Sequence, residues 1–115
     1  MSPFQVVLEG LTRVPGVRGA LLVSAGDGLV VAEASREGVD GAAVAALVSS
    51  LLARLDRTVR AAGYRALRSV HLETRSGGVM AVPAEEDLLL VAVADANANV
   101  GLLRLALRQA IERLH

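Results

Sequence analysis

The chain has 115 residues, of which 53% are hydrophobic and 21% charged, and its formal net charge is zero. This length suggests one domain, and the composition is that of a globular protein with a core, so a disordered chain is excluded. Aromatic residues make up only 2% of the chain and cysteine is absent. A disulfide framework, thiol chemistry and aromatic platforms for stacking bases are therefore excluded, and the balanced charge argues against a nucleic-acid binder.

The N-terminus lacks the charged start and long apolar run of a signal peptide. No segment approaches the roughly 18 unbroken apolar residues of a membrane helix. We therefore expect a soluble cytoplasmic protein that does not insert into a membrane.

The first predicted helix begins at Ser2-Pro3, because serine is a good N-cap and proline suits the first helical position. Pro15-Gly16 ends it. Its apolar residues recur at helical spacing, as Phe4, Val7, Leu8, Leu11 and Val14.

Two strands follow this helix. VRGALLVS, residues 17–24, and LVVAEA, residues 29–34, are joined by a hairpin whose turn holds Asp27-Gly28.

The segment 41–63 is predicted as a long helix, with Asp40 as its N-cap and Gly63 at its end. One stripe has the spacing of a face turned to the core, with Val44, Leu47, Val48, Leu51, Leu55 and Val59. The opposite side carries small residues where a surface helix usually carries charges, and becomes basic only toward the end of the helix. Two stripes on one helix imply two packing partners.

The remaining strands differ in their burial patterns. Leu67–Ser76 alternates, so we expect one buried face and a position at the edge of the sheet. Val79–Pro83 is the fourth strand, and AEED, residues 84–87, is its turn. Leu88–Ala94 has no polar alternation, which predicts burial on both faces near the sheet centre.

After a polar break at 95–99, in which Asn97 is the expected cap, residues 100–114 are predicted as the last helix. Arginines 104, 108 and 113 are expected on its outer face. Its inward face is expected to hold Leu102, Leu103, Ala106, Leu107, Ala110, Ile111 and Leu114. The order α-β-β-α-β-β-β-α predicts an α+β fold, a single domain over residues 1–115 with a five-stranded antiparallel sheet flanked by helices.

Catalytic chemistry is not indicated. His71 and His115 are not near a candidate nucleophile, and there is no metal-ligand spacing, Walker loop or G-x-G-x-x-G. The acidic residues 85–87 are best interpreted as a solvated turn, and the polar residues of 95–99 as partners for free N–H groups at a helix start. We expect no enzyme activity, no cofactor and no metal.

The small-residue stripe predicts a homodimer about a twofold axis, because small side chains let two helices approach closely. The edge strand supports this prediction, since pairing with its symmetry mate would remove an exposed edge. The expected dimer interface consists of Ala42, Ala46, Ser49, Ser50, Ala53, Val70, Leu72 and Thr74. The alternative is that an alanine-rich surface only raises helix propensity.

Three segments together carry a resemblance to a known family. VPGVRGALLVSAGDGLVVA, SVHLET and EDLLLVAVADANANVGLLRLALR, in this order and spacing, resemble the Roadblock family of dynein-light-chain-like and bacterial GTPase-partner proteins. The resemblance covers nearly the whole chain. It implies the Roadblock/profilin-like fold, dimerisation through the second helix and third strand, and regulation or scaffolding of Ras-like small GTPases. Some bacterial members act as GTPase-activating partners.

Arg54, Arg57 and Arg60 are the candidate partner-binding residues, as a basic patch for an acidic GTPase surface. Their other interpretation is charge that favours the C-terminal dipole of the helix. The leading prediction is a dimeric, non-enzymatic partner of a small GTPase. A passive scaffold module and a small-ligand sensor domain are the alternatives.

Overall fold

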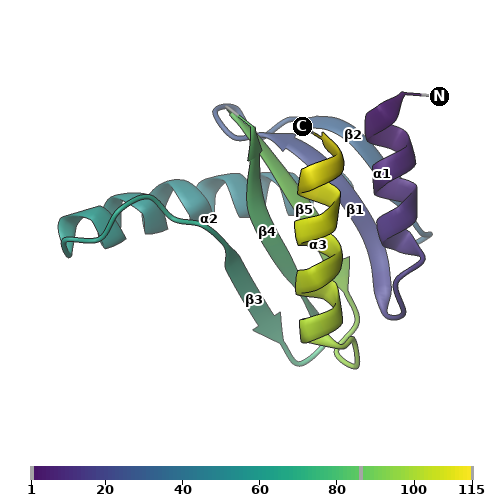
Figure 1. Ribbon diagram of the computed structural model, residues 1–115. Coiled ribbons are helices and arrows are strands. Elements are labelled where there is room, and N and C mark those ends of the chain that lie inside the picture. The colour runs from purple at the N-terminus through teal and green to yellow at the C-terminus, as the bar shows by residue number, and fades with distance from the viewer. Residues whose placement is uncertain (1, 86, 115) are drawn as a thin grey trace.

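The computed structural model describes residues 2–85 and 87–114. Three helices and five strands follow the predicted order along the chain (Figure 1). The elements are α1 (Pro3–Thr12), β1 (Val17–Ser24), β2 (Val30–Ser35), α2 (Gly41–Ala61), β3 (Val70–Thr74), β4 (Gly77–Glu85), β5 (Leu88–Ala94) and α3 (Val100–Leu114).

The five strands form one antiparallel sheet in the order β2-β1-β5-β4-β3. β5 is the central strand, and β3 is at one edge, as the sequence predicts. β5 pairs with both β1 and β4, whereas β3 pairs with β4 alone among the described strands, from Val70 opposite Ala81 to Thr74 opposite Gly77. The predicted α+β fold with a five-stranded antiparallel sheet is confirmed.

Helices cover both faces of the sheet, so there are two cores. α1 and α3 lie side by side on one face and α2 crosses the other (Figure 1). Alternate residues of β5 serve the two sides: Leu90 packs in the core under α1 and α3, and Leu89 and Val91 pack in the core under α2. This arrangement confirms the prediction that β5 is buried on both faces.

The caps of two helices were predicted correctly. Ser2 Oγ accepts the N–H of Gln5 at 3.2 Å at the start of α1, and Asp40 Oδ1 accepts the N–H of Ala43 at 3.0 Å at the start of α2. Such bonds satisfy backbone donors that lack a partner within the helix.

Three details near α3 and β3 differ from expectation. The cap of α3 is Asn99, whose Oδ1 accepts the N–H of Leu102 at 3.0 Å, and not Asn97. Leu102, expected to face inward, is 42% exposed, whereas the rest of the predicted inward face, including Leu103 and Leu107, is buried or half-buried. β3 begins only at Val70, and β4 extends to Glu85 rather than ending at Pro83.

Candidate interaction surface

The largest departure from the predicted pattern concerns the face of α2 that meets the sheet. The buried residues are Gly41, Ala45, Val48 and Leu52. Leu47, predicted to face the core, is 48% exposed. In the first half of α2, glycine and alanine are among the residues that contact the sheet. The side of the helix that faces the sheet is therefore not the side that carries the predicted stripe of larger residues.

α2 also extends beyond the sheet that it covers. Figure 1 shows its C-terminal half projecting past β4 and β3. Of its residues, all of which the structure describes, none after Leu52 is buried. Leu51, Leu55 and Val59 are half-buried but are not part of either described core cluster.

These three residues and Leu47 recur every four positions, so they form one ridge along the helix, which we call the leucine ridge. Along this ridge the direction of the side chains rotates by about 40° per step, since 3.6 residues complete a turn. At its C-terminal end the ridge therefore turns toward the sheet-facing side, where α2 has already passed the sheet edge.

The small residues lie on the other flank of α2. Ala42, Ala46, Ser50 and Ala53 are exposed. Ser49 is half-buried, and its hydroxyl donates to the carbonyl of Ala25 at 2.8 Å. The hydroxyl of Ser49 is thus used within the chain.

The same flank borders a hollow of about 210 Å³ between α2 and the sheet. Ser49, Ala53 and Asp56 line it from the helix, and Leu67, Pro83 and Leu89 are among the residues on the sheet side. Since the small-residue flank looks toward this hollow, the leucine ridge lies on the opposite flank of the helix.

Asp56 ties the projecting half of α2 to the segment before β3. Its Oδ1 accepts the backbone N–H of Leu67 at 3.2 Å, and its Oδ2 accepts Nε of Arg60 at 2.8 Å. The Leu67 hydrogen bond, followed by the hydrogen bond from Arg60, lowers the pKa of the Asp56 carboxyl; burial opposes this effect, and the charge of Arg60 adds to it.

The three arginines proposed from the sequence are all exposed on α2. Arg60 forms the ion pair with Asp56. Within the described part of the chain, Arg54 and Arg57 have no side-chain hydrogen bond or ion pair. Two of the three guanidinium groups are therefore available to an external anion.

The three edge-strand residues proposed from the sequence are in different situations. Val70 and Leu72 are half-buried and pack against the core under α2. Thr74 is exposed, and its hydroxyl donates to the carbonyl of Gly77 at 2.7 Å in the turn between β3 and β4. No described strand pairs with the outer side of β3.

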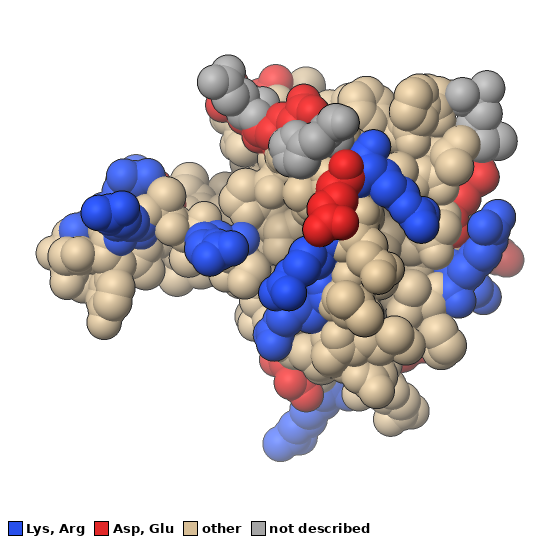
Figure 2. All heavy atoms as spheres, in the orientation of Figure 1, with Lys and Arg blue, Asp and Glu red and all other residues tan. Residues whose placement is uncertain are grey.

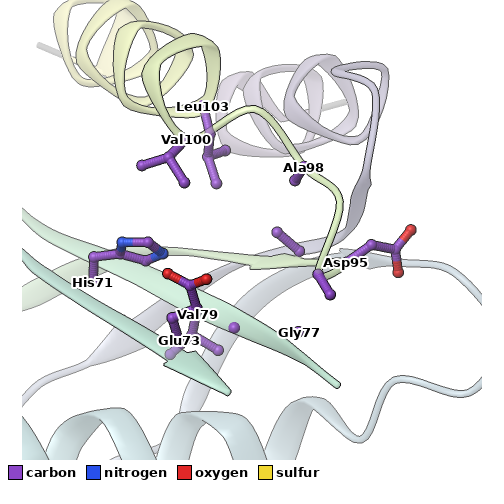
Figure 3. Close-up of a pocket in the computed structure, with 11 residues that line it drawn as sticks. His71, Glu73, Gly77, Val79, Asp95, Ala98, Val100 and Leu103 are labelled. Carbon is purple, nitrogen blue, oxygen red and sulfur yellow. The ribbon is translucent and has the colours of Figure 1, made fainter. Parts of the chain in front are cut away.

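A small cavity lies on the other face, where the start of α3 passes over β3 and β4 (Figure 3). His71 and Glu73 extend from β3 below Val100 and Leu103 of α3. Its volume of about 30 Å³ is the space of one water molecule, far below the roughly 300 Å³ of a small ligand pocket. This cavity gives no support to the small-ligand alternative.

Over residues 2–85 and 87–114, no group of three or more acidic or histidine side chains is placed to hold a metal ion. The acidic residues predicted as a solvated turn include Glu86, which is outside the described residues. Glu85 and Asp87 are exposed.

Of the described helices, none is long and apolar enough to cross a bilayer.

The fold is that of a small α+β domain in which one helix projects past the edge of the sheet (Figure 1). The chain belongs to the Roadblock/LC7 domain family, whose model matches residues 3–94. Two uncharacterised proteins of Methanocaldococcus jannaschii are 34% and 33% identical to it. Both alignments cover 96% of this chain, with 91% and 94% of the respective relatives.

Solved structures agree with this assignment. The gliding protein MglB of Thermus thermophilus is 26% identical, with a TM-score of 0.86 over 99% of this chain and 89% of that one. An MglB with a tetrameric arrangement is 27% identical, with a TM-score of 0.88 over 99% and 88%. Profilin IB of Acanthamoeba castellanii, at 18% identity and a TM-score of 0.67 over 96% and 95%, shares the fold alone. Roadblock/LC7 domains are non-enzymatic regulators, so membership supports a general regulatory or scaffold role.

Two parts of this surface were missed by sequence reasoning. The leucine ridge was assigned to the core, because periodicity finds an apolar stripe but cannot show that the sheet ends before the helix does. The bond from Asp56 to Leu67 joins residues 11 positions apart in a loop-containing segment, and no local pattern predicts it.

Proposed function

We propose that the chain is a homodimeric, non-enzymatic regulator or scaffold that binds a Ras-like small GTPase. The observation that carries the dimer is the projecting half of α2. Its leucine ridge lies outside both described core clusters. This half of the helix projects past the sheet edge formed by β3 (Figure 1). A second copy supplies a partner for both features at once.

In this dimer the two β3 strands pair across a twofold axis and the two α2 helices cross side by side. Each projecting α2 then reaches over the sheet of its mate, where Leu55 and Val59 are covered. Burial of a leucine or valine side chain contributes about 1.5–3 kcal/mol, and each contact occurs twice in a twofold dimer.

The interface proposed from the sequence includes Ala42, Ala46, Ser49, Ser50 and Ala53. We propose that these small residues contribute less than the leucine ridge, because an alanine buries little apolar area and the Ser49 hydroxyl is already bonded to Ala25. Val70 and Leu72 of β3 remain part of the proposed interface, with Thr74 at its margin.

Family membership supports a GTPase partner, and charge supports the proposed docking surface. Arg54 and Arg57 lie on the exposed part of α2 without internal partners among the described residues. Guanidinium groups bind carboxylates in a planar, two-point geometry. The dimer would therefore offer an acidic GTPase surface four arginines around the paired helices, with the Arg60 side chains behind them.

We propose that it acts by holding the GTPase's own catalytic groups in place, since the sequence contains no phosphate loop. Release of phosphate from GTP by a Ras-like GTPase, with and without this protein, tests the activity. Equilibrium binding to the same GTPase loaded with GDP or with a GTP analogue tests the partnership.

Faster hydrolysis with nucleotide-dependent binding supports an activating partner. Binding with an unchanged rate supports a scaffold. Absence of binding to every Ras-like GTPase of the source organism, in both nucleotide states, would contradict the proposed function while leaving the dimer to be judged separately by sedimentation.

A further inference from the structure

A basic groove lies on the face of the molecule opposite α2. It runs between α3 and the sheet edge and has a volume of about 660 Å³. Arg104, Arg108, Ile111 and Glu112 border it from α3, at the spacing of one helix face. The other residues are Leu67, Arg68, Ser69, Val82 and Pro83.

The groove exists because two strands separate. The pairing of β3 with β4 ends at Val70 opposite Ala81, whereas Val82 and Pro83 continue to pair with β5 on their other side. Pro83 has no N–H to donate, so it does not favour extension of the pairing toward Arg68. The gap leaves the apolar side chains of Val82 and Pro83 as a floor.

The charges around this floor are unbalanced. Arg68, Arg104 and Arg108 are exposed, and none has a hydrogen bond or ion pair with another described residue. Among the described residues of the lining, Glu112 is the only acidic one. Figure 2 shows this face, with arginine side chains over α3 and toward the projecting α2.

We propose that this groove binds an acidic segment of a partner protein, with carboxylates on the three arginines and an apolar side chain on Val82, Pro83 and Ile111. Guanidinium groups recognise carboxylates in a planar geometry, and the apolar floor adds a contact that inorganic phosphate cannot use. The described lining contains no aromatic side chain on which a nucleic-acid base could stack. The groove is separate from the α2 surface of the proposed function.

The test uses the full chain and a short fluorescein-labelled peptide in which glutamates alternate with leucines. Fluorescence anisotropy should show binding that weakens with salt. Arg104→Glu combined with Arg108→Glu should reduce affinity by about tenfold or more. The control is Arg13→Glu combined with Arg113→Glu, which makes the same change in net charge outside the groove. It should leave the affinity within about twofold, because only charges close to the bound peptide interact strongly with it. Circular dichroism checks that both variants fold.

Any of the following results would overturn the proposal. One is an equal loss of peptide binding in the two double variants, which would indicate a general charge effect. Another is equal affinity for a peptide of glutamates and glycines, or displacement by inorganic phosphate at similar concentration, because the apolar floor would then be unused. A third is tighter binding of single-stranded RNA than of the peptide, with the same dependence on Arg104 and Arg108.

Discussion

The carboxylate of Asp56 accepts the backbone N–H of Leu67 at 3.2 Å, and this hydrogen bond joins the free half of α2 to the segment that enters β3. The second oxygen of Asp56 accepts Nε of Arg60 one turn later. One side chain thus fixes both the projecting helix and the position where the edge strand starts.

Acid should weaken this connection. Because its folded-state pKa lies below the ordinary value of 3.8, Asp56 stabilises the fold fully above that value and loses this contribution as the pH falls through the lowered pKa. Thermal unfolding of the wild type and Asp56→Asn should therefore differ at neutral pH, with the variant less stable, and converge below the folded pKa.

Arg60→Gln is the matched control, because it removes the ion pair and keeps the bond to Leu67. It should cost less stability than Asp56→Asn, since Asp56→Asn takes the charge away from both hydrogen bonds, whereas Arg60→Gln leaves the carboxylate and its bond to Leu67, the larger cause of the lowered pKa, in place. A difference between wild type and Asp56→Asn that does not change with pH would contradict this account.

Loss of core volume should be far more costly at the sheet centre than at the surface. Leu90 in β5 is fully buried, so Leu90→Ala should lower the free energy of unfolding by about 2–5 kcal/mol. Leu29→Ala is the control, because Leu29 is 64% exposed; it should change the free energy of unfolding by about 0.5 kcal/mol or less. Urea denaturation measures both, and similar costs would show that β5 is not central to stability.

Gly77 should resist substitution more than Gly63. Both have positive φ, +136° and +96°, but a Cβ at Gly77 would be 2.5 Å from the carbonyl oxygen of Ala94, whereas no described neighbour lies within 4 Å at Gly63. Gly63→Ala should cost about 1 kcal/mol from backbone strain alone. Gly77→Ala should cost clearly more in the same urea experiment, and an equal cost would mean that the close approach to β5 is relieved without penalty.

The leucine ridge predicts which α2 variants are monomeric. Leu47→Arg places a charge in the proposed contact and should give a monomer in sedimentation, because a buried charge without a partner is strongly destabilising. Ala46→Arg on the small-residue flank should have a weaker effect. A stronger effect of Ala46→Arg than of Leu47→Arg would place the dimer contact on the small residues. A wild-type chain that is monomeric at micromolar concentration would exclude a dimer through either side of α2.

Charge reversal on α2 should slow association with the GTPase. Arg54→Glu with Arg57→Glu is preferred to a variant that includes Arg60, because Arg60 is engaged with Asp56. The association rate at low salt should fall about tenfold, and its salt dependence should weaken. Stopped-flow measurements with Arg13→Glu/Arg113→Glu as the equal-charge control test this. Equal association rates for the wild type and the α2 variant would mean that the GTPase docks elsewhere on the protein.

Two strands and two helix caps were predicted correctly because their signals are local. Val17–Ser24 and Leu88–Ala94 are apolar runs between turn residues, and both match the observed strands residue for residue. The caps Ser2 and Asp40 need only a side chain and a nearby N–H. Alternation likewise predicted that Leu67–Ser76 lies at an edge, although pairing is limited to Val70–Thr74.

The candidate surfaces were less predictable because they depend on where elements end relative to one another. The rotation of α2 is set by Gly41 and Ala45, whose small size makes them neutral in an apolar pattern although they are buried. The basic groove combines Arg68 with Arg104 and Arg108, residues that no spacing rule connects. Both features appear only once the sheet and helices are in place.

Leu67 and Pro83 line the basic groove on one face of the sheet and the hollow beneath α2 on the other. At this point the same two apolar residues separate the groove from the hollow. Because the backbone N–H of Leu67 is also bonded to Asp56 of α2, a peptide that shifted Leu67 in the groove would disturb the anchor of the projecting half of α2. If that disturbance changed the affinity of α2 for its partner, the partner would change the affinity for the peptide by the same factor.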